Sequence, residues 1–256
     1  MDILKFAIDN ASTFMFVFIR TISILVVTPV LGSWGVPVRM KVALSVILAL
    51  TITSIIPPVS MPQDIVGILI IVFSEVLFGV TIGLLIKFIF TGVEFAGQIS
   101  GFQMGLGMAN VYDPINSVQI TVIGRFLGMM AMLIFIAMDG HLLIIHTLWK
   151  SFAHVPPAGF IMNGRMIGHI VELSGVVFEI AVKLAAPVVA TLIFINAVLG
   201  IMARTVPQLN MFVVGFAITI MAGLFIIALS MPLTEYVIKG FIDSMWLDIA
   251  RFIRII

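Results

Sequence analysis

Six long apolar stretches follow one another along this chain, and they constrain its fold more than any other feature. They cover residues 11–31, 40–58, 65–91, 118–148, 173–203 and 211–234. A helix that crosses the hydrocarbon core of a bilayer needs about 20 apolar residues. The first, second and sixth stretches have about that length, and the other three are longer. The pattern predicts an all-α, polytopic membrane protein made of helical hairpins.

The three longer stretches do not fit as simple spans. At about 1.5 Å per residue, residues 173–203 would form a helix of about 46 Å, which must tilt, kink or extend beyond the hydrocarbon. Pro187 and Gly200 are its candidate kink points, and Asp139-Gly140 is expected to break the fourth stretch in two. His154 to Gly159, with two prolines, is expected to open the longest polar loop. We therefore expect overlong, kinked helices.

Composition agrees with a membrane protein and offers nothing for catalysis. The chain is 62% hydrophobic and 10% charged, whereas soluble domains have about 45–50% and about 25%. So much apolar surface requires cover from lipid or partner subunits. A net charge of +1 gives no electrostatic basis for binding nucleic acid. There is no cysteine, no metalloprotease, serine-hydrolase or P-loop motif, and the four histidines are scattered. The sequence predicts no enzyme, no cofactor and no metal.

No linker divides the chain, so we expect a single unit over residues 1–256. Within it, residues 1–117 hold the N-terminal helices and a glycine- and methionine-rich segment, and residues 118–234 hold further helical hairpins. Residues 235–256 are expected to form an amphipathic helix with a stripe of Ile238, Phe241, Ile242, Met245, Ile249, Phe252, Ile253 and Ile256. Periodicity leaves open whether this stripe faces a membrane surface, a partner or its own protein.

Charged residues interrupt the apolar stretches and are candidate site residues. They are Arg20, Glu75, Lys87, Glu94, Arg125, Glu179 and Lys183, with Asp139 as an eighth. A charge at the bilayer centre costs about 2.5–3.5 kcal/mol on insertion scales, so these groups must pair, line water or lie outside the hydrocarbon. Glu179 and Lys183 are four residues apart and can pair on one helix face. A polar conduit or proton path and contacts between subunits both remain open.

The segment 92–114 is rich in glycine and methionine. Gly97, Gly101 and Gly105 recur every four residues, so on a helix they form a groove that another backbone can approach closely. The helix is expected to end after Gly105, and Asp113-Pro114 is expected to start the next one. Methionine adapts to irregular shapes, which suits a movable seal, although a static packing site fits the same residues.

Several blocks carry a resemblance to a known family. They are Lys183–Ala190, Asn196–Arg204, Pro207–Phe212, the glycine segment with Glu94, Gly97, Gln98 and Gly101, and Val111–Pro114. In this order, over essentially the whole chain, they resemble the R-subunit family of the flagellar type III export gate, which has relatives in virulence type III secretion. Residues 213–216 resemble the flagellar branch more closely.

The resemblance implies a channel-forming subunit in the bacterial inner membrane, at the flagellar basal body. It implies assembly with the P and Q subunits into a helical export-gate complex, with the A and B membrane subunits nearby and unfolded flagellar proteins passing through the centre. In that family the loop after the glycine segment plugs the closed channel. Carried onto this sequence, the plug residues are Phe102, Gln103, Met104, Gly105, Leu106, Gly107, Met108, Asn110 and Tyr112. The family hairpin carries over as Arg204, Pro207, Gln208 and Asn210, of which Gln208 and Asn210 are expected to cap helix ends.

Charge bias sets the expected orientation. If each stretch crosses once, one side carries Lys5, Lys150, Arg165, Lys239, Arg251 and Arg254, and the other carries Arg39, Lys41 and Arg204. The more basic side is expected to be cytoplasmic, together with the C-terminus. The alternative from another class is a secondary transporter with broken helices and midplane charges around a small solute. Against it, the chain shows no internal repeat.

Overall fold

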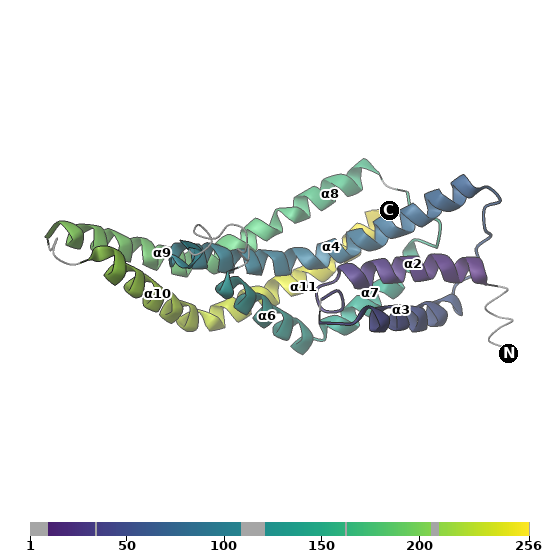
Figure 1. The fold of residues 1–256 in the computed structure, drawn as a ribbon. Coiled ribbons are helices and arrows are strands. Elements are labelled where there is room, and N and C mark those ends of the chain that lie inside the picture. The colour runs from purple at the N-terminus through teal and green to yellow at the C-terminus, as the bar shows by residue number, and fades with distance from the viewer. Residues whose placement is uncertain (1–9, 34, 109–120, 162, 206–209, 256) are drawn as a thin grey trace. The chain divides into compact units, whose positions relative to one another are not determined.

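The computed structural model describes residues 10–33, 35–108, 121–161, 163–205 and 210–255. Its elements are α2 (Ala11–Val27), α3 (Val38–Thr53), α4 (Ile65–Gln103), the short 3-10 turn η1 (Leu106–Met108), α6 (Val122–Ala137), α7 (Gly140–His154), α8 (Gly164–Ser174), α9 (Val176–Thr205), α10 (Met211–Leu229) and α11 (Met231–Ile255). Within the described ranges there are helices and no strands (Figure 1). The predicted all-α fold class is confirmed.

Contacts divide the chain into two compact units, and each is assembled from distant parts of the sequence. Unit 1 comprises residues 1–88, 136–174 and 243–256, and unit 2 comprises residues 89–135 and 175–242. Boundaries fall inside α4, α6 and α11, so these three helices contribute residues to both units.

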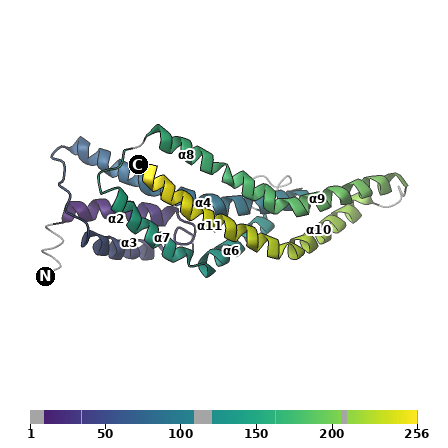
Figure 2. The same ribbon diagram turned by 180° about the vertical axis from the view of Figure 1, so that it is seen from behind.

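Unit 1 is built around buried aromatic rings and close helix contacts. Figure 2 shows α2 lying beside α3. Phe78 of α4 is fully buried and stacks on Phe160 and Phe252, with ring centroids 4.7 and 6.4 Å apart. Gly83 lets α4 approach α2, because a methyl group there would lie 2.6 Å from the Cβ of Val27. Aromatic packing and a side-chain-free contact therefore fix α4 in this unit.

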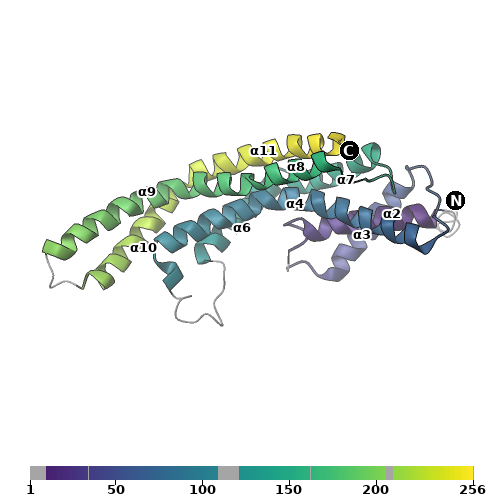
Figure 3. The same ribbon diagram turned by 90° about the horizontal axis from the view of Figure 1, so that it is seen from above.

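Unit 2 combines a hairpin with a tight helix crossing. Helices α9 and α10 run side by side (Figure 1). The last turns of α4 lie next to α6 (Figure 3), where Phe90 meets the edge of Phe135 with centroids 5.4 Å apart. Phe95 of α4 meets Phe178 of α9 in the same edge-on way, at 6.0 Å. Aromatic contacts thus join α4 to both neighbours.

Two expected boundaries needed correction, those of the polar loop and of the sixth stretch, whereas the expected break of the fourth stretch is confirmed. The polar loop after His154 is interrupted by α8, so residues 164–174 are helical. The expected break of the fourth stretch lies at Asp139, which adopts φ 56° between α6 and α7. Helix α9 continues through Pro187 and Gly200. The sixth stretch does not end at residue 234, because α10 ends at Leu229 and α11 already begins at Met231.

Helix length does not give six separate membrane spans. Among the described residues, two helical runs are long and apolar enough to cross a membrane, Ile65–Gln103 and Gly164–Thr205. Two further pairs qualify only if each is one bent span: α6 with α7, bent by 68°, and α10 with α11, bent by 57°. That makes up to four candidate spans by length and composition. Helices α2 and α3 have only 17 and 16 residues.

The apolar stripe of α11 is covered by the protein itself. Its buried members are Ile238, Ile242, Met245, Ile249, Phe252 and Ile253. Phe252 stacks on Phe78 and on His169 of α8 within unit 1. Of the three surfaces that periodicity left open for this stripe, the protein's own interior is the one observed.

Candidate functional site

The crossing of α4 and α6 in unit 2 brings two helix backbones into direct contact. A methyl group on Gly97 would lie 2.5 Å from the Cα of Gly124, and one on Gly128 would lie 3.0 Å from the Cγ of Glu94. Gly101 faces Thr121, whose hydroxyl donates to the carbonyl oxygen of Gly97 over 3.1 Å. The glycine groove of α4 is therefore filled by α6 of the same chain.

Gly105 does not take part in that groove, which corrects its expected place on the helix. Helix α4 ends at Gln103, and Gly105 adopts φ 87°, a left-handed conformation that glycine adopts without steric cost. A methyl group there would also lie 2.7 Å from the ring of Phe216 on α10. Both the left-handed backbone conformation and the close approach of the Phe216 ring require glycine at this position.

Met104 is held beneath α10. Its side chain is fully buried, and a methyl group on Gly223 would overlap it. The hydroxyl of Thr219 lies 3.2 Å from the carbonyl oxygen of Met104 and 3.1 Å from that of Phe216, so one proton is shared between two acceptors. Helix α10 thus contacts the two residues that directly follow α4 through Phe216, Thr219 and Gly223.

The remaining expected plug residues are distributed around this contact. Phe102 is 69% exposed, and its ring covers the backbone of Gly107, where a methyl group would lie 2.8 Å from the ring. Gln103 and Leu106 are half-buried. Met108 ends the 3-10 turn. Asn110, Tyr112 and the expected helix start at Asp113-Pro114 lie outside the described residues.

The family hairpin is described in part. Arg204 lies in the exposed last turn of α9. Asn210 precedes α10, and its side-chain oxygen accepts from the backbone N–H of Val213 over 3.4 Å, as an N-cap does. Pro207 and Gln208 lie outside the described residues.

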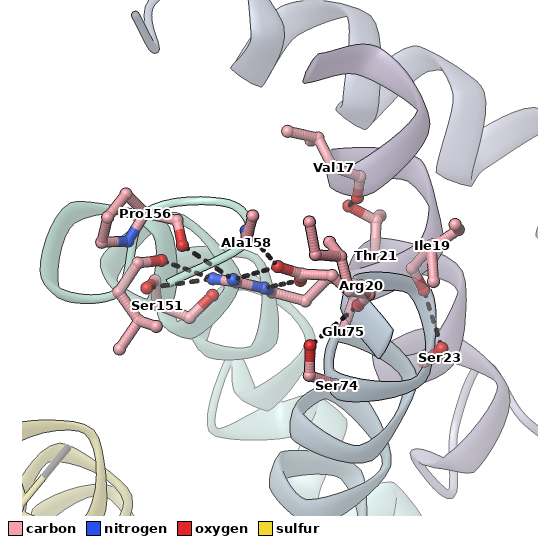
Figure 4. Close-up of polar contacts among 12 residues, drawn as sticks. Val17, Ile19, Arg20, Thr21, Ser23, Ser74, Glu75, Ser151, Pro156 and Ala158 are labelled. Atoms are coloured by element: carbon pink, nitrogen blue, oxygen red, sulfur yellow. Dashed lines mark hydrogen bonds and ion pairs between the residues drawn. The ribbon is translucent and has the colours of Figure 1, made fainter. Parts of the chain in front are cut away.

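Arg20 and Glu75 form a fully buried ion pair in unit 1. Nε of Arg20 lies 2.5 Å from one carboxylate oxygen of Glu75, and a terminal nitrogen lies 2.9 Å from the other (Figure 4). Both side chains have no solvent exposure. A bidentate arginine–carboxylate pair of this kind is strongly directional.

Every N–H group of the Arg20 guanidinium has an acceptor. The donors that do not reach Glu75 point at the carbonyl oxygens of Ser151, Val155 and Pro156, at 3.2, 2.8 and 3.4 Å. These carbonyls end helix α7, where unpaired acceptors and the negative end of the helix dipole favour a cation. The guanidinium also lies over the rings of Phe152 and Phe78.

Glu75 in turn fixes the chain after α7. It accepts the backbone N–H of Ala158 over 2.9 Å, and Ala158 adopts φ 66°, which is unfavourable for a residue with a Cβ. The pair therefore ties α2, α4 and the end of α7 into one joint. Among the described residues, Arg20 and Glu75 are the only buried charged side chains.

The other candidate charges lie nearer the surface. Glu179 and Lys183 pair at 2.6 Å and are each about half exposed, at 52% and 53%. The Lys183 ammonium also lies 5.1 Å from the ring centre of Phe241 on α11. Lys87, Arg125 and Asp139 are exposed, and Glu94 is half-buried. No group of three potential metal ligands occurs in the described part of the chain.

The sequence alone predicted neither the pairing of Arg20 with Glu75 nor the contacts of α10 with Met104 and Gly105. Pairing of Arg20 with Glu75, 55 residues away, needs knowledge of how α2 and α4 align. The α10 contacts had a usable signal: Gly215, Thr219 and Gly223 are small residues spaced four apart on an otherwise apolar helix, and all three are buried. Such a stripe marks a close helix contact.

Comparison with known proteins adds the decisive observation. Residues 11–245 match the model of the family described as bacterial export proteins, family 1. The chain belongs to this family. Its similarity to curated members of the export family extends over nearly the whole length, so the resemblance seen in the motifs is confirmed.

Three relatives named flagellar biosynthetic protein FliR illustrate this similarity. The Bacillus subtilis relative is 33% identical over 237 residues, 91% of each chain. The Pectobacterium carotovorum relative is 32% identical over 88% of this chain and 87% of its own. The Escherichia coli relative is 31% identical over 84% and 82%. These names denote flagellar biosynthetic proteins, and none of them denotes an enzyme.

Proposed function

We propose that this chain is a channel-forming subunit of the flagellar type III protein export gate in the bacterial inner membrane. The observation that carries the proposal is the match to the export family over residues 11–245, together with flagellar relatives that are matched over 82–91% of their length. Unfolded flagellar proteins are the cargo. The flagellar names of these relatives favour a flagellar over a virulence secretion system.

Exposed apolar side chains on the α9–α10 hairpin support a role inside an assembly. Phe178 and Phe194 of α9 and Met221 and Phe225 of α10 are each exposed by 64–74%. Helix α10 is apolar on all sides. A soluble monomer rarely leaves so large an apolar surface bare, so lipid and partner subunits must cover it. We assign that cover to the P and Q subunits and to lipid, with the A and B subunits nearby.

The pore plug is the segment from Phe102 to Tyr112. Its base is anchored by Met104 and Gly105, while Phe102 presents an exposed ring. Apolar and flexible side chains close a pore to ions and yield to a passing polypeptide, because they make no directional bonds that must be broken.

Ion conductance tests the plug. The complex of this chain with its P and Q partners is reconstituted in planar bilayers. Deleting residues 106–111 is expected to raise basal conductance strongly, and Phe102→Ala is expected to raise it less. Phe73→Ala is the matched control, because it removes a similarly exposed phenylalanine from the same helix, α4, outside the plug. Unchanged conductance after the deletion, in a complex that still co-purifies, contradicts the plug.

The family hairpin is proposed to hold the α9–α10 tip in shape through caps from Gln208 and Asn210. The N-cap bond of Asn210 supports this. A Gln208→Ala, Asn210→Ala double variant is expected to reduce co-purification of the P and Q subunits. Unchanged assembly and export count against it.

Orientation is proposed with the C-terminus in the cytoplasm, from Lys239, Arg251 and Arg254 near that end of the chain. A C-terminal alkaline phosphatase fusion, active only in the periplasm, should stay inactive, and a fluorescent protein fusion should fold.

A further inference from the structure

We infer that α10 acts as a clamp that keeps the plug segment in its closed position, with Phe216, Thr219 and Gly223 as positioning residues for Met104 and Gly105. The inference rests on the proposed function of that segment as a plug. The inference goes beyond that function, because it names the residues outside the plug segment that hold the segment in place and the motion that releases it.

The contacts of the clamp lie on one face of α10. Gly223 admits the buried side chain of Met104, and the ring of Phe216 lies against Gly105. Thr219 lies between them, within 3.2 Å of the Met104 carbonyl oxygen. Steric fit, a shared hydrogen bond and a ring contact therefore act on two adjacent residues at the start of the plug.

The chemistry of the clamp suits a contact that must open. Met104 inserts into a site without a side chain, so it can leave without breaking an ion pair. Thr219 keeps an acceptor on its own helix, the Phe216 carbonyl oxygen at 3.1 Å, when the Met104 carbonyl departs. The Thr219 hydroxyl is therefore not left unsatisfied, whereas breaking the Arg20 network would leave several buried N–H groups without acceptors. A displacement of α10 from the end of α4 therefore frees the plug at low cost.

Gly223→Ala tests the steric part. The added methyl group overlaps the Met104 side chain, which must leave its position against α10, so basal conductance of the reconstituted complex should rise. Gly215→Ala is the matched control on the same helix, because its methyl group meets only the Leu199 side chain at 3.5 Å, an ordinary contact. Both variants gain the same helix propensity. Equal conductance in the two variants overturns the steric clamp.

Thr219→Val tests the hydrogen bond while keeping the shape of the side chain. Loss of one neutral hydrogen bond corresponds to about a 2- to 13-fold change in the open-to-closed ratio, and the shared proton places the expected rise at the lower end of that range. Thr219→Ser should restore normal conductance, since it keeps the hydroxyl. A rise with both variants would assign the effect to packing and overturn the hydrogen bond's role.

A cross-link tests the motion itself. The chain contains no cysteine, so Met104→Cys with Gly223→Cys introduces a single pair. Oxidation should join the pair, lower conductance and stop export of a hook or filament protein, and a reductant should restore both. Failure of the pair to cross-link, or continued export with the cross-link formed, overturns the clamp.

The deletion of residues 106–111 distinguishes a failure of the clamp inference from a failure of the proposed plug. If the deletion raises conductance while Gly223→Ala and the cross-link have no effect, the plug stands and the clamp is wrong. If the deletion has no effect, the plug is wrong.

Discussion

Helix α4 is held in two different ways along its length. In unit 1 its glycines contact α2, and the buried Arg20–Glu75 pair fixes that contact with directional bonds to the end of α7. In unit 2 its glycines contact α6, and its end is held by α10 through Met104 and a shared hydroxyl proton. Helix α4 is therefore fixed by a buried, directional polar network in unit 1 and by apolar packing contacts in unit 2.

This difference indicates which part can move. A buried ion pair tolerates little displacement, because lengthening its bonds leaves charged groups unsatisfied in a medium of low polarity. Glycine and methionine contacts lose energy gradually as surfaces separate. We expect unit 1 to serve as a rigid frame and the end of α4 in unit 2 as the adjustable part.

Breaking the polar joint gives the largest expected effect. Arg20→Ala should lower the free energy of unfolding by about 3–5 kcal/mol, because it leaves Glu75 buried and unpaired. Thermal and denaturant unfolding of the detergent-purified chain measure this. The double variant Arg20→Met, Glu75→Leu removes both charges and should be much less destabilised than either single variant. Additive losses in the double variant would show that the pair is not a coupled joint.

Filling a glycine contact gives a smaller effect. Gly97→Ala forces a methyl group against the Gly124 backbone, so α4 and α6 must separate, at about 1–3 kcal/mol by the usual cost of overpacking. Gly200→Ala on α9 is the control, because nothing lies within 4 Å of the added methyl group. It should be neutral or stabilising by up to about 1 kcal/mol from helix propensity. The difference in unfolding midpoint between the two variants is the measurement, and its absence contradicts a close crossing.

The fold could be predicted from sequence to the extent that local patterns determine it. Apolar stretches gave the helices, Asp139-Gly140 gave a break, and the four-residue spacing of glycines gave a close contact. The boundary at Ser230 was missed because residues 211–234 are apolar on both sides of it. Helix α8 was missed because Pro156-Pro157 and nearby polar residues suggested a loop, while the helix begins only at Gly164.

Partners across the chain could not be predicted in the same way. Arg20 and Glu75 were each recognisable as charges out of place, but their pairing depends on the axial alignment of two apolar helices, which no local pattern encodes. The glycine groove likewise gave no partner, and only the structure shows that α6 fills it. Thr219 and Gly223 bear on the site only through tertiary contact with Met104.

One chemical change made at two places gives the smallest effect and the closest comparison. Glu179→Gln removes the charge of an ion pair in which both side chains are about half exposed, so the expected loss is at most about 1 kcal/mol and should shrink with added salt. Glu75→Gln makes the same change where no water reaches and leaves the Arg20 charge without its counter-ion, so it should cost several times more. Unfolding of the detergent-purified chain at low and high salt measures both. The Glu179–Lys183 pair is shielded from water if Glu179→Gln lowers the free energy of unfolding as much as Glu75→Gln does, or if its effect does not change with salt. In that case the polar contacts no longer distinguish a rigid unit 1 from an adjustable unit 2.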